Sequence, residues 1–277
     1  MWRELFVVFG VGCCLSISSV AETYYYGEFD PNTVQLESLP GRPGEFKTLR
    51  RFTFTDPDGL QWIVPEGAEI NGASIPRLLW TVYGAPMGAY NKGAEASYLN
   101  ASVIHDFYCD TKGGEEKRTA HSTHKAFYYA MLTDGVDPSR AAQMYYAVRT
   151  FGPHWWVERT FSADGESARA EIVTSIPAVR ERQISEADKL KAQANLAVVD
   201  QRLADTPSES ASSGGIFSWV GGLFGSTAAT DFDPDQVSAA DELEITEADL
   251  NALEAMADEQ REEIIKRENP EIKNIRD

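Results

Sequence analysis

The sequence predicts an α+β fold, with an N-terminal β-hairpin followed by a three-helix core and an acidic helical C-terminal extension. Three observations lead to this prediction. Apolar and polar residues alternate over residues 46–64, the apolar spacing becomes helical between about 93 and 152, and the composition shifts to Ala, Glu, Asp, Gln and Lys after about residue 180. The 277 residues, 43% of them hydrophobic, are enough to bury a core.

The hairpin is predicted from two runs rich in aromatic and β-branched residues. Residues 46–55 and 60–64 flank the tetrapeptide Asp56-Pro57-Asp58-Gly59, in which proline and glycine favour a turn. A loop that contains Asn71-Gly72 and Ile75-Pro76 follows the hairpin.

Three helices are expected next. The first covers residues 94–109 and is stopped by the glycine-containing run 110–114, and the second covers 116–132. The third extends to Phe151, with Asp137 as its N-cap, Pro138 at its first position and Gly152 as its terminator. Together with the hairpin, these helices define one α+β domain over residues 22–180.

The remaining chain is divided into a helix (181–206), a Ser- and Gly-rich linker (207–234) and an acidic helical tail (235–277). Helices are expected at about 186–204 and 247–268, because each begins with a hydroxyl residue three positions before an acid. The last helix has few apolar positions, so we expect mainly a solvated face. The alternative is a surface that binds a protein partner.

The net charge of −18 argues against nucleic acid as a partner, because phosphate backbones are repelled. Residues 231–277 carry 16 acids and 5 bases, so most of this charge lies in the tail. Residues 1–21 have the pattern of a signal peptide, which predicts an exported chain, periplasmic or secreted. A retained membrane anchor or a lipid on Cys13 is the alternative. Cleavage would leave Cys109 as the single cysteine.

An apolar segment at residues 215–225 interrupts the linker, with Phe217, Trp219 and Phe224. Aromatic residues of this kind favour a membrane interface, which makes phospholipid or a membrane surface a candidate partner. The segment would equally suit docking onto the domain or onto another protein.

The strongest chemical signal is a cluster of His105, His121 and His124 with Asp106 and Cys109. On a helix, His105 and Cys109 share a face, whereas Asp106 points about 100° away. If the first two helices are antiparallel, His105 and His124 meet between them. His105 would then serve as a base, and Asp106 could hold a hard cation. The structural alternative is a hydrogen-bonded core pair with Cys109 as a small buried residue. Another alternative is a zinc site formed by His121, His124 and either His105 or Asp106.

Four blocks of sequence resemble the family of unknown function DUF1353 over about residues 45–157, a family that occurs in bacteria and in phage or prophage genomes. They are residues 71–77, 104–108, 126–131 and 144–152. The later blocks also resemble the helices of prokaryotic and fungal secreted phospholipases A₂.

The phospholipase resemblance implies a phospholipase A₂-like core with a histidine base, a neighbouring calcium-binding aspartate and an upstream calcium loop. Carried over by position, the base is His105 and the calcium ligand is Asp106. This chain departs from the pattern at three places. It has Asn71 where the loop aspartate is expected, His124 where an aspartate orients the base, and Cys109 where a tyrosine follows.

Two functions follow from these residues. The first is an exported phospholipase A₂-like hydrolase with His105 and His124 as catalytic residues, and with Asp106 and Asn71 as ligands of calcium rather than zinc. The second is a non-catalytic exported binding or assembly domain of phage-related origin, which keeps only the scaffold. Either could bind a protein partner through the C-terminal helices.

Overall fold

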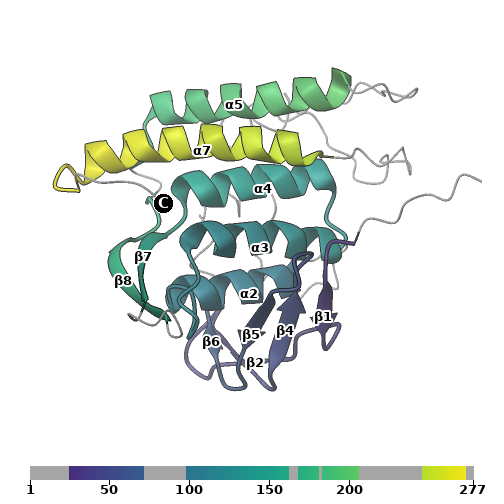
Figure 1. Ribbon diagram of the computed structural model, residues 1–277. Helices are drawn as coiled ribbons and strands as arrows, with labels where there is room; N and C mark the ends of the chain where they lie inside the picture. Colours follow the sequence, from purple (N-terminus) through teal and green to yellow (C-terminus); the bar gives the residue numbers. More distant parts are fainter. Residues whose placement is uncertain (1–24, 72–97, 162–167, 181–182, 206–244, 273–277) are drawn as a thin grey trace, which may run out of the picture.

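The computed structural model describes residues 25–71, 98–161, 168–180, 183–205 and 245–272. It confirms the α+β class. Figure 1 shows small N-terminal sheets below a stack of helices in the order α2, α3, α4, α7 and α5, with a separate hairpin, β7 and β8, at one side. The signal-peptide prediction (1–21) and the apolar segment 215–225 lie outside the described residues. Among the described residues, no helix is long and apolar enough to span a membrane.

The predicted hairpin is present as β4 (Phe52–Thr55) and β5 (Gln61–Val64), and β1 (Glu28–Asp30) adds a third antiparallel strand beside β4. Asp56 holds the turn. Its Oδ1 atom accepts hydrogen bonds from the backbone N–H groups of Asp58 and Leu60, and its Oδ2 atom accepts one from the Trp62 indole. This local network explains why the turn residues specify the hairpin.

The first predicted strand, residues 46–55, is wrong as a single element. Phe46–Thr48 forms β3, which belongs to a second sheet between β2 (Leu36–Ser38) and β6 (Glu69–Ile70). A bend with Arg50 and Arg51 exposed separates β3 from β4. The two buried runs therefore enter different sheets instead of extending one strand.

The three central helices are α2 (Leu99–Asp110), α3 (Ala120–Thr133) and α4 (Pro138–Phe151). The predicted α4 boundaries are confirmed, and the Asp137 side chain accepts a hydrogen bond from the Arg140 N–H. By contrast, α3 begins four residues later than predicted, where the Thr119 hydroxyl accepts from the Ser122 N–H. These helices form most of the hydrophobic core together with the inner faces of the small sheets.

A long hairpin, β7 (His154–Phe161) with β8 (Ala168–Ile176), follows α4 and was not predicted. Its first strand buries Trp155, which packs with Cys109 and Ala120 at the α2–α3 junction. The Trp155 indole donates to the backbone oxygen of Arg118, 2.8 Å away. This hairpin therefore covers the end of the helix pair that carries the histidines.

The C-terminal helices are α5 (Glu186–Asp205) and α7 (Glu247–Glu268). The solvated face predicted for the last helix accounts for only part of its surface, because α7 lies between α4 and α5 (Figure 1). Its inner face buries apolar and polar residues alike: Leu250, Leu253, Ala257, Gln260, Arg261, Ile264 and Ile265. Gln260 joins the three helices, since its amide accepts from the Tyr146 hydroxyl and donates to the backbone oxygen of Asp188.

Candidate functional site

His105 of α2 and His124 of α3 meet inside the protein. The Nε2 atom of His105 lies 2.9 Å from the Nδ1 atom of His124, and both side chains are fully buried. His105 precedes the end of α2 by five residues and His124 follows the start of α3 by four. The two residues thus stand at similar distances from the connecting turn, as in two antiparallel helices. The Phe127 ring covers His105, with the ring centroids 4.6 Å apart.

The hydrogen bonds of this pair determine where its protons are. The Nε2 atom of His124 lies 3.1 Å from the backbone oxygen of Pro153, and a carbonyl can only accept. His124 therefore carries its proton on Nε2, and its Nδ1 atom must accept from His105. It follows that neutral His105 carries its proton on Nε2 and keeps a lone pair on Nδ1.

Cys109 lies beside the pair, one helical turn after His105. Its Sγ atom is 3.5 Å from the Nε2 atom and 3.9 Å from the Nδ1 atom of His105. The Cys109 side chain is buried and forms no disulfide. Two imidazoles and one thiol are thus grouped in one enclosed space.

Burial keeps both imidazoles neutral. It lowers the pKa of His105 to about 3. Burial also lowers the pKa of His124 well below its ordinary value, and the nearby His105, Arg149 and His154 lower it further. Neutral imidazoles can accept a proton or bind a metal, but holding a positive charge here is costly.

A second cluster occupies the neighbouring face of α2. Asp106 is fully buried, and its Oδ2 atom accepts a hydrogen bond from the Asn71 backbone N–H at 2.8 Å. The Asn71 side-chain nitrogen lies 3.4 Å from an Asp110 carboxylate oxygen. Asn71 and Asp110 are both exposed, so this oxygen-rich corner opens to solvent. Two carboxylates and an amide are donors of the hard type that calcium binds, so the donor set fits that ion.

Sequence reasoning missed two components of the site. Asp110 follows Asp106 by four residues, and that spacing alone places both carboxylates on one face of α2. The Pro153 carbonyl carries no comparable signal, because only the tertiary fold brings it to His124.

His121 is not part of the cluster. Its Nε2 atom lies 3.2 Å from a carboxylate oxygen of Glu254 on α7, and its side chain is 38% exposed. The predicted zinc site containing His121 and His124 is therefore wrong, because one histidine faces α7 and the other faces α2.

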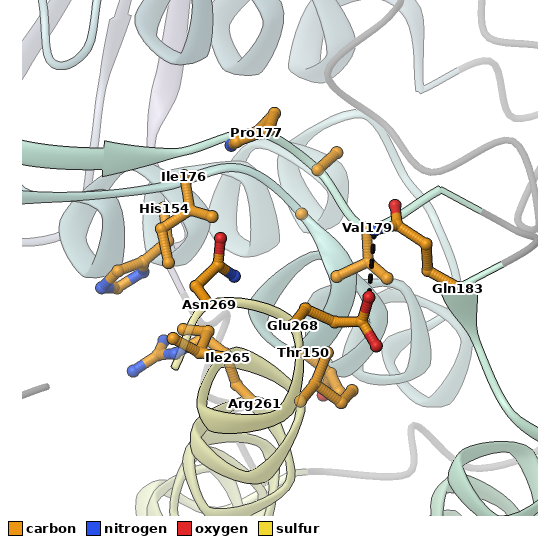
Figure 2. Close-up of a pocket in the computed structure, with 13 residues that line it drawn as sticks. Thr150, His154, Ile176, Pro177, Val179, Gln183, Arg261, Ile265, Glu268 and Asn269 are labelled. Carbon is orange, nitrogen blue, oxygen red and sulfur yellow. Dashed lines mark hydrogen bonds between the residues drawn. The ribbon is translucent and has the colours of Figure 1, made fainter. Parts of the chain in front are cut away.

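Two cavities among the described residues lie away from the histidine pair. One is bounded by α4, the end of β8 and α7, and Figure 2 shows Thr150, His154, Arg261 and Glu268 around it. Within it, the Gln183 side chain donates to Glu268 at 3.2 Å. The other cavity lies near β1 and the start of α2. Neither is lined by His105 or His124.

Comparison with known proteins identifies the segment that carries both clusters. Residues 46–148 match the model of the family described as "Protein of unknown function (DUF1353)". We call these matched residues the DUF1353 segment. The match confirms the resemblance expected over about residues 45–157, and the DUF1353 segment contains His105, Asp106, Cys109, Asp110 and His124.

Two relatives of the chain come from Sinorhizobium fredii (strain NBRC 101917 / NGR234). Uncharacterized protein y4jT is 40% identical over 153 residues, which cover 55% of this chain and 41% of y4jT. Uncharacterized protein y4iH is 34% identical over 150 residues, covering 52% of this chain and 58% of y4iH. The chain thus matches roughly half the length of these relatives. No solved structure shows significant similarity to the chain.

Proposed function

We propose that the DUF1353 segment is a phospholipase A₂-like hydrolase in an exported protein, with His105 as the base that activates water. The observation that carries the proposal is the hydrogen-bond chain from His105 through His124 to the Pro153 carbonyl. It leaves a lone pair on the Nδ1 atom of a neutral imidazole whose other nitrogen is held in place. A base with its tautomer fixed by a second group is the arrangement that general-base hydrolysis requires.

In this proposal each histidine has a separate role. His105 takes a proton from water at Nδ1, the resulting hydroxide attacks the ester carbonyl, and His105 then returns the proton to the alcohol as the ester bond breaks. His124 is a positioning residue that accepts from His105 Nε2. A neutral acceptor stabilises the transient imidazolium less than a carboxylate does, so we expect slow turnover.

Asp106 and Asn71, together with Asp110, are the residues proposed to hold calcium. When bound, the ion would polarise the ester carbonyl as a Lewis acid. Asp106 also holds Asn71, the residue that follows β6, because it accepts the Asn71 N–H. The proposed ligands Asp106 and Asp110 and the proposed base His105 therefore lie on neighbouring faces of α2.

The second candidate is a non-catalytic exported binding or assembly domain of phage-related origin. It is favoured by the complete burial of His105 and His124, by the Phe127 ring over His105, and by the position of both described cavities away from the pair. In that case the imidazole pair only joins α2 to α3, and a protein partner would bind through the C-terminal helices.

The deciding experiment measures fatty-acid release from phospholipid vesicles by the purified protein, with calcium and with chelator. The hydrolase proposal expects calcium-dependent release that His105→Ala abolishes. His121→Ala is the matched control, since it removes a partly exposed histidine outside the cluster. Release that survives His105→Ala would refute His105 as the base. No release by a folded protein in calcium would favour the assembly domain.

Calcium titration by calorimetry tests the cation site separately. Asp106→Asn and Asp110→Asn should each weaken binding, whereas Glu115→Gln, an exposed acid in the turn after α2, should leave it unchanged. If all three variants bind calcium with the same affinity, Asp106 and Asp110 are not its ligands.

A further inference from the structure

A group of three potential metal ligands lies at the α2–α3 junction. The Nε2 atom of His105, the Nδ1 atom of His124 and the Sγ atom of Cys109 face one another, and all three residues are buried. From this geometry we infer that these atoms form a binding site for zinc, separate from the oxygen-rich corner of Asp106, Asn71 and Asp110.

The distances between the donor atoms agree with this inference. Zinc bonds of about 2.0–2.1 Å to nitrogen and about 2.3 Å to sulfur place tetrahedral ligand atoms about 3.3 Å apart for two nitrogens and about 3.6 Å apart for nitrogen and sulfur. Two observed separations are 2.9 Å between the nitrogens and 3.5 Å between Cys109 Sγ and His105 Nε2, and all three donor atoms lie within 4.8 Å of one another. Small side-chain movements therefore suffice to admit the ion. Three protein ligands would leave a fourth position for water.

The surroundings of His124 support metal binding as well. Histidines that bind a metal through one nitrogen usually donate the other N–H to a carbonyl or carboxylate. His124 already donates Nε2–H to the Pro153 carbonyl, which leaves Nδ1 directed at the cluster.

The two faces of α2 would select different ions. Imidazole and thiolate are the donors that zinc prefers, whereas carboxylate and amide oxygens suit calcium. His105 and Cys109 are four residues apart, and so are Asp106 and Asp110. One helix therefore presents a nitrogen–sulfur pair and an oxygen pair side by side.

Zinc binding moves the protons of the cluster in a defined way. Cys109 releases its thiol proton, and the His105 proton transfers from Nε2 to Nδ1 because Nε2 binds the metal. The Nδ1 lone pair is then occupied by a proton. If the proposed hydrolase function holds, zinc therefore inhibits hydrolysis, because His105 can no longer accept a proton at Nδ1. Zinc binding itself does not depend on that function.

The test uses the full chain and cobalt as a spectroscopic probe for zinc. Cobalt should give a thiolate-to-metal charge-transfer band and the visible bands of a tetrahedral site at one equivalent, and zinc should displace both. Cys109→Ser should lose the charge-transfer band and His124→Ala should weaken zinc binding at least tenfold. The matched controls are His121→Ala and the double variant Cys13→Ser/Cys14→Ser, both of which should bind as the parent does.

The outcomes separate the two proposals. A charge-transfer band that survives Cys109→Ser, or that is lost with Cys13 and Cys14, would overturn the zinc site. So would an unchanged zinc affinity in folded His124→Ala or the absence of any cobalt spectrum. The hydrolase is tested by fatty-acid release, so it can fail while the cobalt spectrum appears, and the reverse can also occur. If both hold, stoichiometric zinc should stop release in calcium.

Discussion

The Nε2 atom of His105 donates to the Nδ1 atom of His124 across 2.9 Å, and His124 in turn donates to the backbone oxygen of Pro153. The direction of both bonds follows from the carbonyl at the end of the chain, which cannot donate. This relationship fixes the tautomers of two buried histidines. It also underlies both the proposed base and the proposed zinc site.

His124→Ala should lower the turnover of the proposed hydrolase by about 10²-fold or more, because His105 loses the acceptor that fixes its tautomer. His124→Gln should retain most of the activity, since an amide can accept from His105 and donate to Pro153 as the imidazole does. The measurement is kcat and KM for both variants, with folding checked by circular dichroism. Equal kcat in the two variants would exclude a positioning role for His124.

Glu254→Gln should weaken the dependence of the free energy of unfolding on pH in the acidic range. Burial alone would raise the pKa of Glu254, but hydrogen bonds from His121 and Tyr145 and the charge of Lys125 outweigh it and lower the pKa to about 2. The unfolded carboxyl has its ordinary pKa of 4.5, so the stabilisation is complete above that pH and is lost as the pH falls toward 2. Its size is about 1–3 kcal/mol. Urea unfolding between pH 2.5 and 6 measures this contribution. If the free energy of unfolding changes with pH in the same way in the parent and in Glu254→Gln, Glu254 is not the group responsible.

Gly113→Ala should destabilise the turn between α2 and α3 strongly. Gly113 has a φ of +91°, and an added Cβ would lie 2.0 Å from the backbone oxygen of Arg118. Gly59 is the matched control, because its φ is +78° but a Cβ there meets nothing within 4 Å. For Gly59→Ala we expect the free energy of unfolding to fall by about 1 kcal/mol, because alanine is strained at this positive φ. Backbone displacement should raise the loss for Gly113→Ala to about 3 kcal/mol or more. Denaturant unfolding measures the free energy of unfolding of both variants. Similar decreases would show that the backbone of the turn moves aside at little cost.

Gln260→Ala should loosen the packing of α5 and α7 on α4. Gln260 is fully buried, and its removal leaves the Tyr146 hydroxyl and the Asp188 carbonyl without this partner, at a cost of about 2–4 kcal/mol. Asn251→Ala, an exposed change on the same helix, should alter the free energy of unfolding by less than about 0.5 kcal/mol. Hydrogen exchange of α5 amides is the second readout. Unchanged exchange in Gln260→Ala would show that the contact is dispensable.

Local signals were sufficient for the helices and for the β4–β5 hairpin. Asp137, Pro138 and Gly152 specify α4 because each satisfies a requirement of a helix end, and Asp56 specifies the hairpin turn through its own hydrogen bonds. The meeting of His105 and His124 could be expected for the same reason, since a short connection between two helices restricts how they pack.

Other features depend on contacts that local patterns do not contain. The hairpin of β7 and β8 has one buried end and a largely exposed far end, so it lacks a sustained alternation of apolar residues. The burial of α7 was missed because polar Gln260 and Arg261 occupy part of its inner face. Partners for these side chains are supplied by helices that are distant in the sequence: Tyr146 in α4 bonds Gln260, and the backbone of Asp188 in α5 does so as well.

The position of α7 on α4 has a consequence for synthesis of the chain. The surface of α4 around Tyr145, Tyr146 and Arg149 is covered by residues 254–260, more than 100 positions later. While the ribosome is still translating the intervening residues, that surface has no cover from α7. We expect the nascent domain to reach its final, protease-resistant form only after α7 has left the exit tunnel.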